Sequence, residues 1–98
     1  MNCSNRLIVL GARSTVKRFI RSRWEQTLGA RYGDWLQNSP GRYVCQFDTE
    51  ALLLEQLKKL SRQWPTLTFL LDYELERKRT KGLAKAKAGE IEHCDISY

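Results

Sequence analysis

The chain has 98 residues, a hydrophobic content of 42% and a formal net charge of +6, which is typical of one small globular domain spanning residues 1–98. It has no apolar run long enough to cross a membrane, and residues 1–10 lack the apolar segment and cleavage site of a signal peptide, so we expect a soluble cytoplasmic protein without a membrane partner. Its three cysteines are odd in number and widely spaced, which favours reduced thiols over a disulfide framework.

A strand and a helix are predicted first. Residues 5–10 are short, almost continuously apolar and end at a glycine, which predicts a central strand buried on both faces. Ser14 is a suitable N-cap for the helix that follows. Apolar residues recur there at helical spacing: Val16, Phe19, Ile20 and Trp24. Basic residues, among them Lys17, Arg18 and Arg21, occupy the other faces, so this helix is apolar inward and basic outward.

Residues 27–41 form the least regular part of the sequence, because three glycines and Pro40 interrupt them. They are either a loop pinned to the core by its aromatic residues or a loop that holds a short strand. Residues 42–48 then alternate, which predicts a strand with Tyr43, Cys45 and Phe47 on one face. Asp48 or Thr49 is expected to cap the second helix.

The segment 52–73 contains the clearest helix and the clearest strand. Its apolar stripe has helical spacing: Leu53, Leu57, Leu60 and Trp64. Pro65 cannot continue that helix, so we expect it to end there, with Trp64 anchoring it to the sheet. From residue 66 to residue 75 the period changes to two, which predicts a strand.

The last quarter of the chain is predicted to be a hairpin with a long tip. Residues 76–87 are charged, with Leu83 as the one sizeable apolar residue, and predict a mobile loop. Residues 90–98 alternate weakly, with Cys94, Ile96 and Tyr98 on one face, and predict an edge strand antiparallel to residues 66–75. The order of elements predicts an α+β, ferredoxin-like fold, with an antiparallel sheet of four to five strands and two helices on one face.

The positive charge is unevenly distributed: residues 1–44 carry +6, residues 45–76 carry −3 and residues 77–98 carry +3. A basic surface is compatible with nucleic acid, although a solvated surface has the same composition. The candidate contacts are on the first helix and the 77–87 loop, and their fields add if both lie on the same side of the molecule. They are Lys17, Arg18, Arg21, Arg77, Lys78, Arg79, Lys81, Lys85 and Lys87.

The sequence gives little support for catalysis. The glycines make no phosphate-binding loop, and the cysteines and the single histidine have no zinc-site spacing. Alternation along a strand sends His93 and Cys94 to opposite faces, so buried cysteines acting as small apolar residues are the better interpretation. The aromatics of the strand at 42–47 lie two positions short of the usual exposed pair, and the first strand has none, so the stacking platform of an RNA-recognition motif is absent or altered. We expect no catalytic residue, metal or cofactor.

Several segments together resemble the YubB-like ferredoxin-like domains, small proteins of uncharacterised function that are often encoded on plasmids, phages and other mobile elements. They are Asn2-Cys3-Ser4-Asn5 with Leu7, Val9, Gly11, Val16 and Phe19, then Phe47-Asp48-Thr49, residues 60–69, Asp72-Tyr73-Glu74 and Gly89-Glu90. The chain departs from the family at Glu50-Ala51, where prolines are usual, and in the lysine-rich segment 77–87. The resemblance implies a ferredoxin-like fold and adds no catalytic or cofactor residue.

The sequence therefore predicts a small binding or accessory module without catalytic activity. Its partner would be an unidentified protein or further copies of the chain. The alternative is a nucleic-acid-binding protein that contacts phosphates without reading sequence, through the nine basic residues named above.

Overall fold

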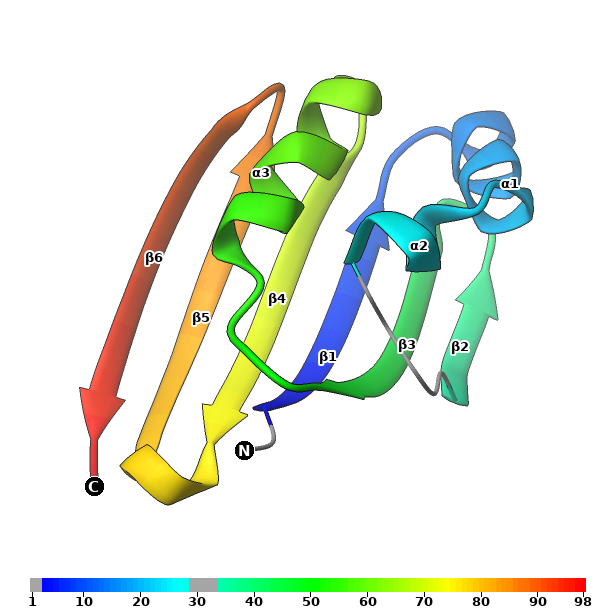
Figure 1. The fold of residues 1–98 in the computed structure, drawn as a ribbon. Helices are drawn as coiled ribbons and strands as arrows, with labels where there is room; N and C mark the ends of the chain where they lie inside the picture. Colours follow the sequence, from blue (N-terminus) through cyan, green and yellow to red (C-terminus); the bar gives the residue numbers. More distant parts are fainter. Residues whose placement is uncertain (1–2, 29–33) are drawn as a thin grey trace.

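The computed structural model of the chain describes residues 3–28 and 34–98. Its elements are β1 (Cys3–Leu10), α1 (Arg13–Arg21), α2 (Trp24–Leu28), β2 (Asp34–Ser39), β3 (Arg42–Thr49), α3 (Leu54–Gln63), β4 (Thr68–Leu75), the 3-10 turn η1 (Glu76–Lys78), β5 (Thr80–Lys87) and β6 (Glu90–Ser97). The strands form one antiparallel sheet in the order β2-β3-β1-β4-β5-β6, and the α-helices lie over one of its faces (Figure 1). None of the described helices is long and apolar enough to cross a membrane.

The α+β class and the antiparallel sheet are confirmed, but the element count differs from the prediction. Within the described residues the sheet has six strands instead of four to five, and there are three α-helices instead of the expected two. The extra strand is β5, where a loop was predicted, and the extra helix is α2, which begins at Trp24.

The core lies between the helices and the covered face of the sheet. Phe19 of α1 is at its centre, fully buried, with ring centroids 5.5 Å from those of Trp24 and Trp64 and 5.4 Å from that of Phe69. β1 is central, between β3 and β4, as predicted. However, its burial alternates and Arg6 is exposed, because helices cover only one face of the sheet. The expectation that this strand is buried on both faces is therefore wrong.

Both predicted helices are present, but their starting points are shifted. Ala12, not Ser14, is the N-cap of α1. Ser22 is its C-cap, and the Ser22 hydroxyl donates to the Phe19 carbonyl at 2.6 Å. β3 continues to Thr49, so α3 begins at Leu54 and neither Asp48 nor Thr49 caps it. The C-terminal end agrees with the prediction, because Trp64 is the C-cap and lies partly buried against the core.

Residues 80–87 form a regular strand in the interior of the sheet, so the prediction of a mobile loop is wrong. The side chains that face the helices are small: Ala84 and Ala86 are fully buried, and Leu83 is 55% exposed on the other face. At Gly82 the ring of Tyr73 from β4 covers the backbone, at a place where a Cβ atom would overlap that ring. The segment therefore packs through its smallest residues, while its lysines face solvent.

The strand β6 is an edge strand, as expected, but it pairs with β5 and not with β4. A two-residue turn at Ala88 and Gly89, both with positive φ, connects the two strands. The Gly89 N–H donates to the hydroxyl of Ser61, a fully buried residue of α3, at 3.0 Å. This bond fastens the turn to the helix. Of the two alternatives for residues 27–41, the short strand is confirmed by β2, while residues 29–33 lie outside the described residues.

Candidate interaction surfaces

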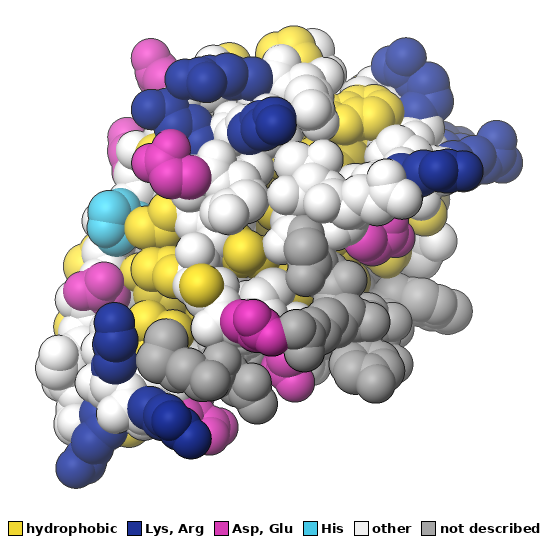
Figure 2. Space-filling model, viewed as in Figure 1, with side chains coloured by type: hydrophobic (Ala, Val, Ile, Leu, Met, Phe, Trp, Pro, Cys, Tyr) yellow, Lys and Arg dark blue, Asp and Glu magenta, His cyan; other side chains and the backbone are white. Residues whose placement is uncertain are grey.

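The outer face of α1 is the first candidate surface, because it carries a concentrated positive charge. Residues 13–23 contain five basic residues and no acidic one. Val16 and Phe19 turn inward to the core, which leaves Lys17, Arg18 and Arg21 exposed. Figure 2 shows lysine and arginine side chains gathered on the side of the molecule where α1 lies. This surface can attract an anionic partner over several ångströms.

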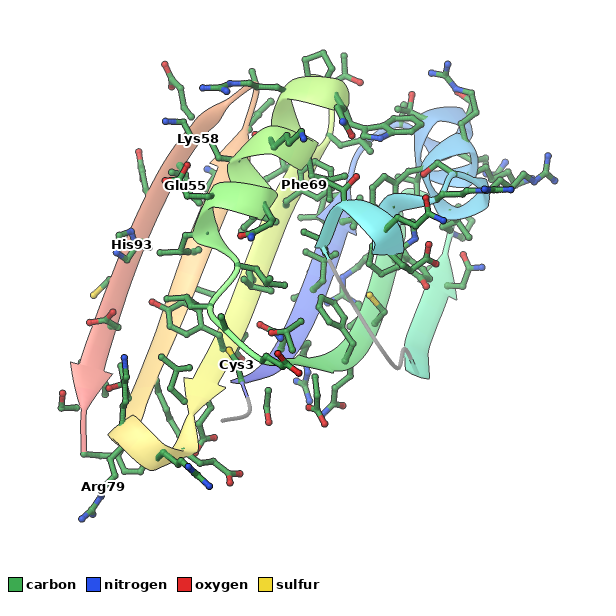
Figure 3. The ribbon with its side chains drawn as sticks, viewed as in Figure 1. Cys3, Glu55, Lys58, Phe69, Arg79 and His93 are labelled. Atoms are coloured by element: carbon green, nitrogen blue, oxygen red, sulfur yellow. The ribbon has the colours of Figure 1, made fainter. Side chains whose placement is uncertain are left out.

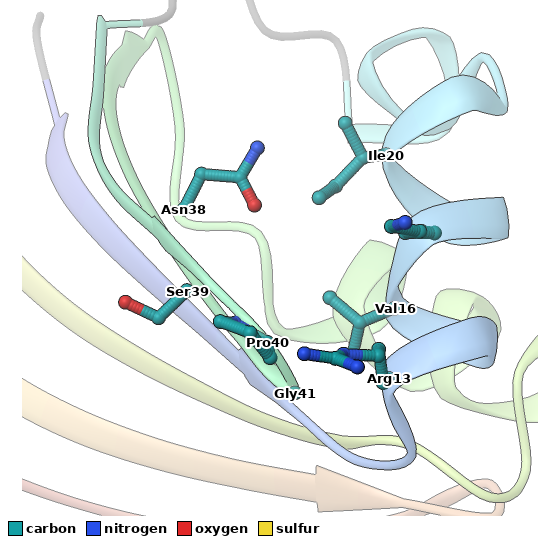
Figure 4. A pocket seen from close by; sticks show the side chains of 8 residues that line it. Arg13, Val16, Ile20, Asn38, Ser39, Pro40 and Gly41 are labelled. Atoms are coloured by element: carbon teal, nitrogen blue, oxygen red, sulfur yellow. The ribbon is translucent and has the colours of Figure 1, made fainter.

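A hollow of about 370 Å³ lies between α1 and the turn that joins β2 to β3 (Figure 4). Arg13 and Lys17 line it from the helix, and Asn38, Ser39 and Pro40 line it from the other side. The turn is held in place by the bond from the Gly11 N–H to the Gly41 carbonyl, 3.1 Å long. The hollow is therefore bordered by positive charge on one side and by polar turn residues on the other.

The lysines of β5 lie in different electrostatic surroundings. Each faces a carboxylate-bearing residue on a neighbouring strand: Lys81 is opposite Glu74, Lys85 opposite Glu92, and Lys87 opposite Glu90. The Lys81 Nζ lies 3.9 Å from the Glu74 Oε1. Opposite charges in cross-strand pairs attract each other and reduce the net field of the strand. These lysines therefore form a mixed-charge surface rather than a purely positive one.

The turn at η1 holds the remaining candidate residues. Arg77, Lys78 and Arg79 are exposed there, at the end of the sheet where the C-terminus lies (Figures 1 and 3). The Arg79 guanidinium lies 5.7 Å from the centroid of the Tyr98 ring. The Tyr98 hydroxyl donates to a carboxylate oxygen of Glu74, which ties the end of β6 back to β4.

The structure does not bring the nine candidate basic residues together. α1 packs over β3 on the covered face, whereas the side chains of Lys81, Lys85 and Lys87 project from the uncovered face. The strands β1 and β4 lie between β3 and β5. The fields of the first helix and the 77–87 segment therefore do not combine on one side. The condition under which the two fields would add is not met, and the outer face of α1 carries its positive charge separately from β5.

The uncovered face of the sheet is the second candidate surface. Its central row runs through Val44 of β3, Ile8 of β1 and Leu70 of β4, which are opposite one another in the register. Val44 is 6% exposed, and the other two are partly buried by their neighbours on the sheet. Toward the β6 edge this row continues to Lys85 and Glu92, whereas Leu83 and Ile96, which are 55% and 64% exposed, lie in the neighbouring rows. This face therefore combines a short apolar row with exposed apolar side chains that lie among charged ones.

The three cysteines have different surroundings. Cys3 and Cys45 are buried on the covered face, and burial raises the pKa of Cys45 to about 12 and raises the pKa of Cys3 as well. Cys94 is exposed, so the expectation of a buried thiol is wrong for this residue. The reason is its position on β6, directly opposite Leu83 on the uncovered face. His93 points to the other face at the same edge (Figure 3).

No cluster of three or more His, Cys, Asp or Glu side chains suited to a metal ion occurs within residues 3–28 and 34–98. His93, the chain's single histidine, is exposed on β6 and lies opposite Ala84 in the register. That neighbour supplies neither a nucleophile nor a base. The absence of a metal and of a catalytic residue stays a prediction, and metal analysis of the purified protein can test it.

Sequence reasoning missed a buried polar cluster at one end of β1. Asn5 is 1% exposed, and its Nδ2 donates to the carbonyls of Cys3 and Phe47 and to the Thr49 hydroxyl, at 3.2, 3.3 and 3.0 Å. The Thr49 hydroxyl donates in turn to the Ala51 carbonyl at 2.8 Å. The cluster fixes the path from β3 toward α3, so its role is structural. The sequence indicated this cluster only through Asn5, a polar residue within the predicted central strand.

Comparisons of the chain with protein-family models, with curated proteins and with solved structures find no match.

Proposed function

We propose that the chain is a non-catalytic binding module with a ferredoxin-like arrangement, extended by a C-terminal hairpin. The support for this arrangement is the strand order β2-β3-β1-β4, with α1 and α2 between β1 and β2 and with α3 between β3 and β4. β5 and β6 then add to the outer side of β4. The proposed kinship with the YubB-like domains, and with their mobile-element setting, rests on the segments that resemble them. Leu60, Leu67 and Phe69 of the clearest segment are fully buried, so that likeness concerns fold-determining positions.

The uncovered face of the sheet is the observation that carries the proposed binding role. No helix of the described residues lies over it, and it exposes Leu83 and Ile96 in the rows beside the apolar row of β3, β1 and β4. Arg6 and Asp72, which are opposite each other, lie in the same row as Leu83. Apolar side chains interspersed with charges of both signs suit a protein partner better than a nucleic acid.

A pull-down after nuclease treatment tests this role, with a matched pair of variants. Leu83→Gln removes an exposed apolar side chain from the uncovered face, and Gln56→Ala alters an exposed position of α3 on the other side of the molecule. We expect wild type and Gln56→Ala to retain a stoichiometric protein partner that Leu83→Gln loses. If wild type retains no protein once nuclease has acted, the proposal fails.

Polyanion binding through α1 is the second candidate function. It is favoured by the five basic residues of 13–23, which have no acidic neighbour within that segment. About four phosphate contacts would give sequence-independent binding, with a Kd on the order of 10⁻⁴–10⁻⁶ M and a slope of log K against log salt of about −3 to −4. The contacts would come from one helix face alone.

Two triple variants, each of which removes three positive charges, distinguish DNA binding by α1 from DNA binding by β5. Changing Lys17, Arg18 and Arg21 to alanine should abolish retention of duplex DNA at low salt. Changing Lys81, Lys85 and Lys87 to alanine should leave most of it, because those lysines face carboxylates in the sheet. Equal losses in the two variants would contradict the assignment to α1, and no binding by wild type at low salt would end the nucleic-acid hypothesis.

A further inference from the structure

The outer edge of β6 offers a row of backbone hydrogen-bonding groups. The Tyr98 N–H donates to the Arg79 carbonyl at 2.7 Å, and antiparallel ladders alternate between hydrogen-bonded and non-bonded pairs. Even-numbered residues of β6 therefore bond to β5, and the peptide groups of Ile91, His93, Asp95 and Ser97 point away from the sheet. A regular edge of this kind is a template for another strand.

The two edges of the sheet differ in how far they are protected. At β2 the register shifts between Trp35 and Gln37, which is an irregularity that disfavours the addition of a further strand. β6 keeps an unbroken register with β5 over all eight of its residues and contains neither proline nor glycine. The regular edge is therefore at β6.

We propose that two copies of the chain associate through antiparallel pairing of their β6 strands, about a two-fold axis at Cys94. In this register His93 lies opposite Asp95 of the second copy, and the symmetry creates that pair twice. Glu92 then faces Ile96 of the second copy. An imidazole N–H directly across from a carboxylate can donate a hydrogen bond to it, whereas like charges in that position oppose the pairing.

Neighbouring registers are less favourable. An axis at Glu92 places two identical glutamates opposite each other, and an axis at Asp95 does the same with two aspartates. An axis at His93 places the two histidines together and loses both His–Asp pairs. If an odd-numbered residue of one copy lay opposite an even-numbered residue of the other, the uncovered faces of the two sheets would lie on opposite sides of the dimer. The charge pattern of β6 therefore selects the axis at Cys94.

Two further features of this edge suit a second copy. Leu83 and Cys94 are opposite each other on the uncovered face, so the pairing places these two side chains of one copy next to the same two of the second copy across the axis. Glu90 and Glu92 lie opposite Lys87 and Lys85 of the same chain, which reduces the repulsion between the acidic strands. The product is a closed symmetric dimer with one continuous sheet.

Sedimentation velocity under reducing conditions tests the assembly on the full chain. The mass should rise from the monomer's 11.5 kDa toward twice that value as the protein concentration increases. His93→Asp places an acid opposite Asp95 of the second copy and should weaken the dimer by about tenfold. His93→Lys places a positive charge opposite Asp95 of the second copy and should retain the dimer. Equal melting temperatures of both variants at low concentration show that the monomer fold is intact, since His93 is exposed.

Oxidation with diamide tests the register. The two Cys94 thiols lose two protons and two electrons to diamide, which becomes the hydrazine, and a disulfide forms across the axis. Cys3 and Cys45 are buried, so Cys94→Ser should remove the cross-link. A chain that stays monomeric at every concentration, a dimer that His93→Asp does not weaken, or a dimer without the Cys94 cross-link would each overturn the proposal. The assembly does not depend on the binding roles proposed above.

Discussion

Replacing Gly82 by alanine should destabilise the protein, although the same change at an unhindered strand position is usually favourable. A Cβ atom at residue 82 would overlap the Cζ and Oη atoms of Tyr73 and lie 2.5 Å from its Cε2 atom. The ring cannot move aside easily, because Tyr73 is 1% exposed and its hydroxyl donates to the Asp95 Oδ2 at 3.3 Å. Gly82 has no positive φ, so the close approach of the ring, rather than backbone conformation, requires glycine here.

The expected cost follows from two opposing effects. Overpacking of a filled core costs about 1–3 kcal/mol, and the loss of glycine flexibility in the unfolded chain returns about 0.4–1 kcal/mol. With both effects near the middle of their ranges, the net loss is about 1–2 kcal/mol, which corresponds to a fall in Tm of roughly 4–16 °C for a domain of this size. Urea unfolding followed by tryptophan fluorescence measures it.

A double-mutant cycle provides the control for this prediction. Tyr73→Leu removes the ring from above residue 82, so in that background Gly82→Ala should be neutral or stabilising. The coupling between the two positions should be at least about 1 kcal/mol, as expected for residues in direct contact. If Gly82→Ala costs the same in both backgrounds, or costs nothing in wild type, the packing of Tyr73 on β5 is wrong.

The remaining predictions concern exposure, ionisation and packing. In the folded protein Cys94 should react with Ellman's reagent within the mixing period, while the other two cysteines react only on unfolding. Burial raises the pKa of Tyr43 and Tyr73 from 10.0 to about 12, so the folded state holds these protons more tightly than the unfolded chain. Their contribution to stability is complete below pH 10 and is lost as the pH rises through about 12, which alkaline titration of phenolate absorbance with parallel urea melts can follow. Phe19→Ala should cost about 3–5 kcal/mol in the same melts, because the ring is fully buried among three other aromatic rings. Ser61→Ala should cost about 1 kcal/mol, since it removes the acceptor of the Gly89 N–H.

Large apolar side chains made part of the fold predictable from the sequence. Apolar residues recur at helical spacing on α1, at Val16 and Phe19, and on α3, at Leu57 and Leu60. Along β4 they alternate with period two. Each pattern gives the element one apolar face, which it buries against the core. These elements were found, with ends shifted by a few residues. The start of α3 was misplaced because Thr49 uses its hydroxyl in the Asn5 cluster, which prolongs β3.

The strand β5 was missed because its inward residues are small. A search for large apolar residues finds Leu83, which faces solvent, and overlooks Ala84 and Ala86, which are fully buried. The packing at Gly82 depends on the ring of Tyr73, a contact between positions on different strands that no local pattern contains. The basic residues of the first helix and of residues 77–87 were considered as one candidate surface for the same reason. Without a predicted strand at β5, the sequence did not show which face of the sheet its lysines occupy. Period-two alternation of lysine with small residues was the available signal.

Native-state amide hydrogen exchange by NMR, on dilute protein, tests most directly the claim that residues 80–97 complete the sheet. β5 lies between two strands, so all of its amides should be protected, from Thr80 to Lys87. In β6 the protection should alternate, with slow exchange at even-numbered residues, which bond to β5, and fast exchange at Ile91, His93 and Asp95, which point outward. Rapid, uniform exchange from residue 77 to residue 87 would instead show a mobile loop, and the account of the sheet, of the β5 lysines and of the β6 edge would be contradicted.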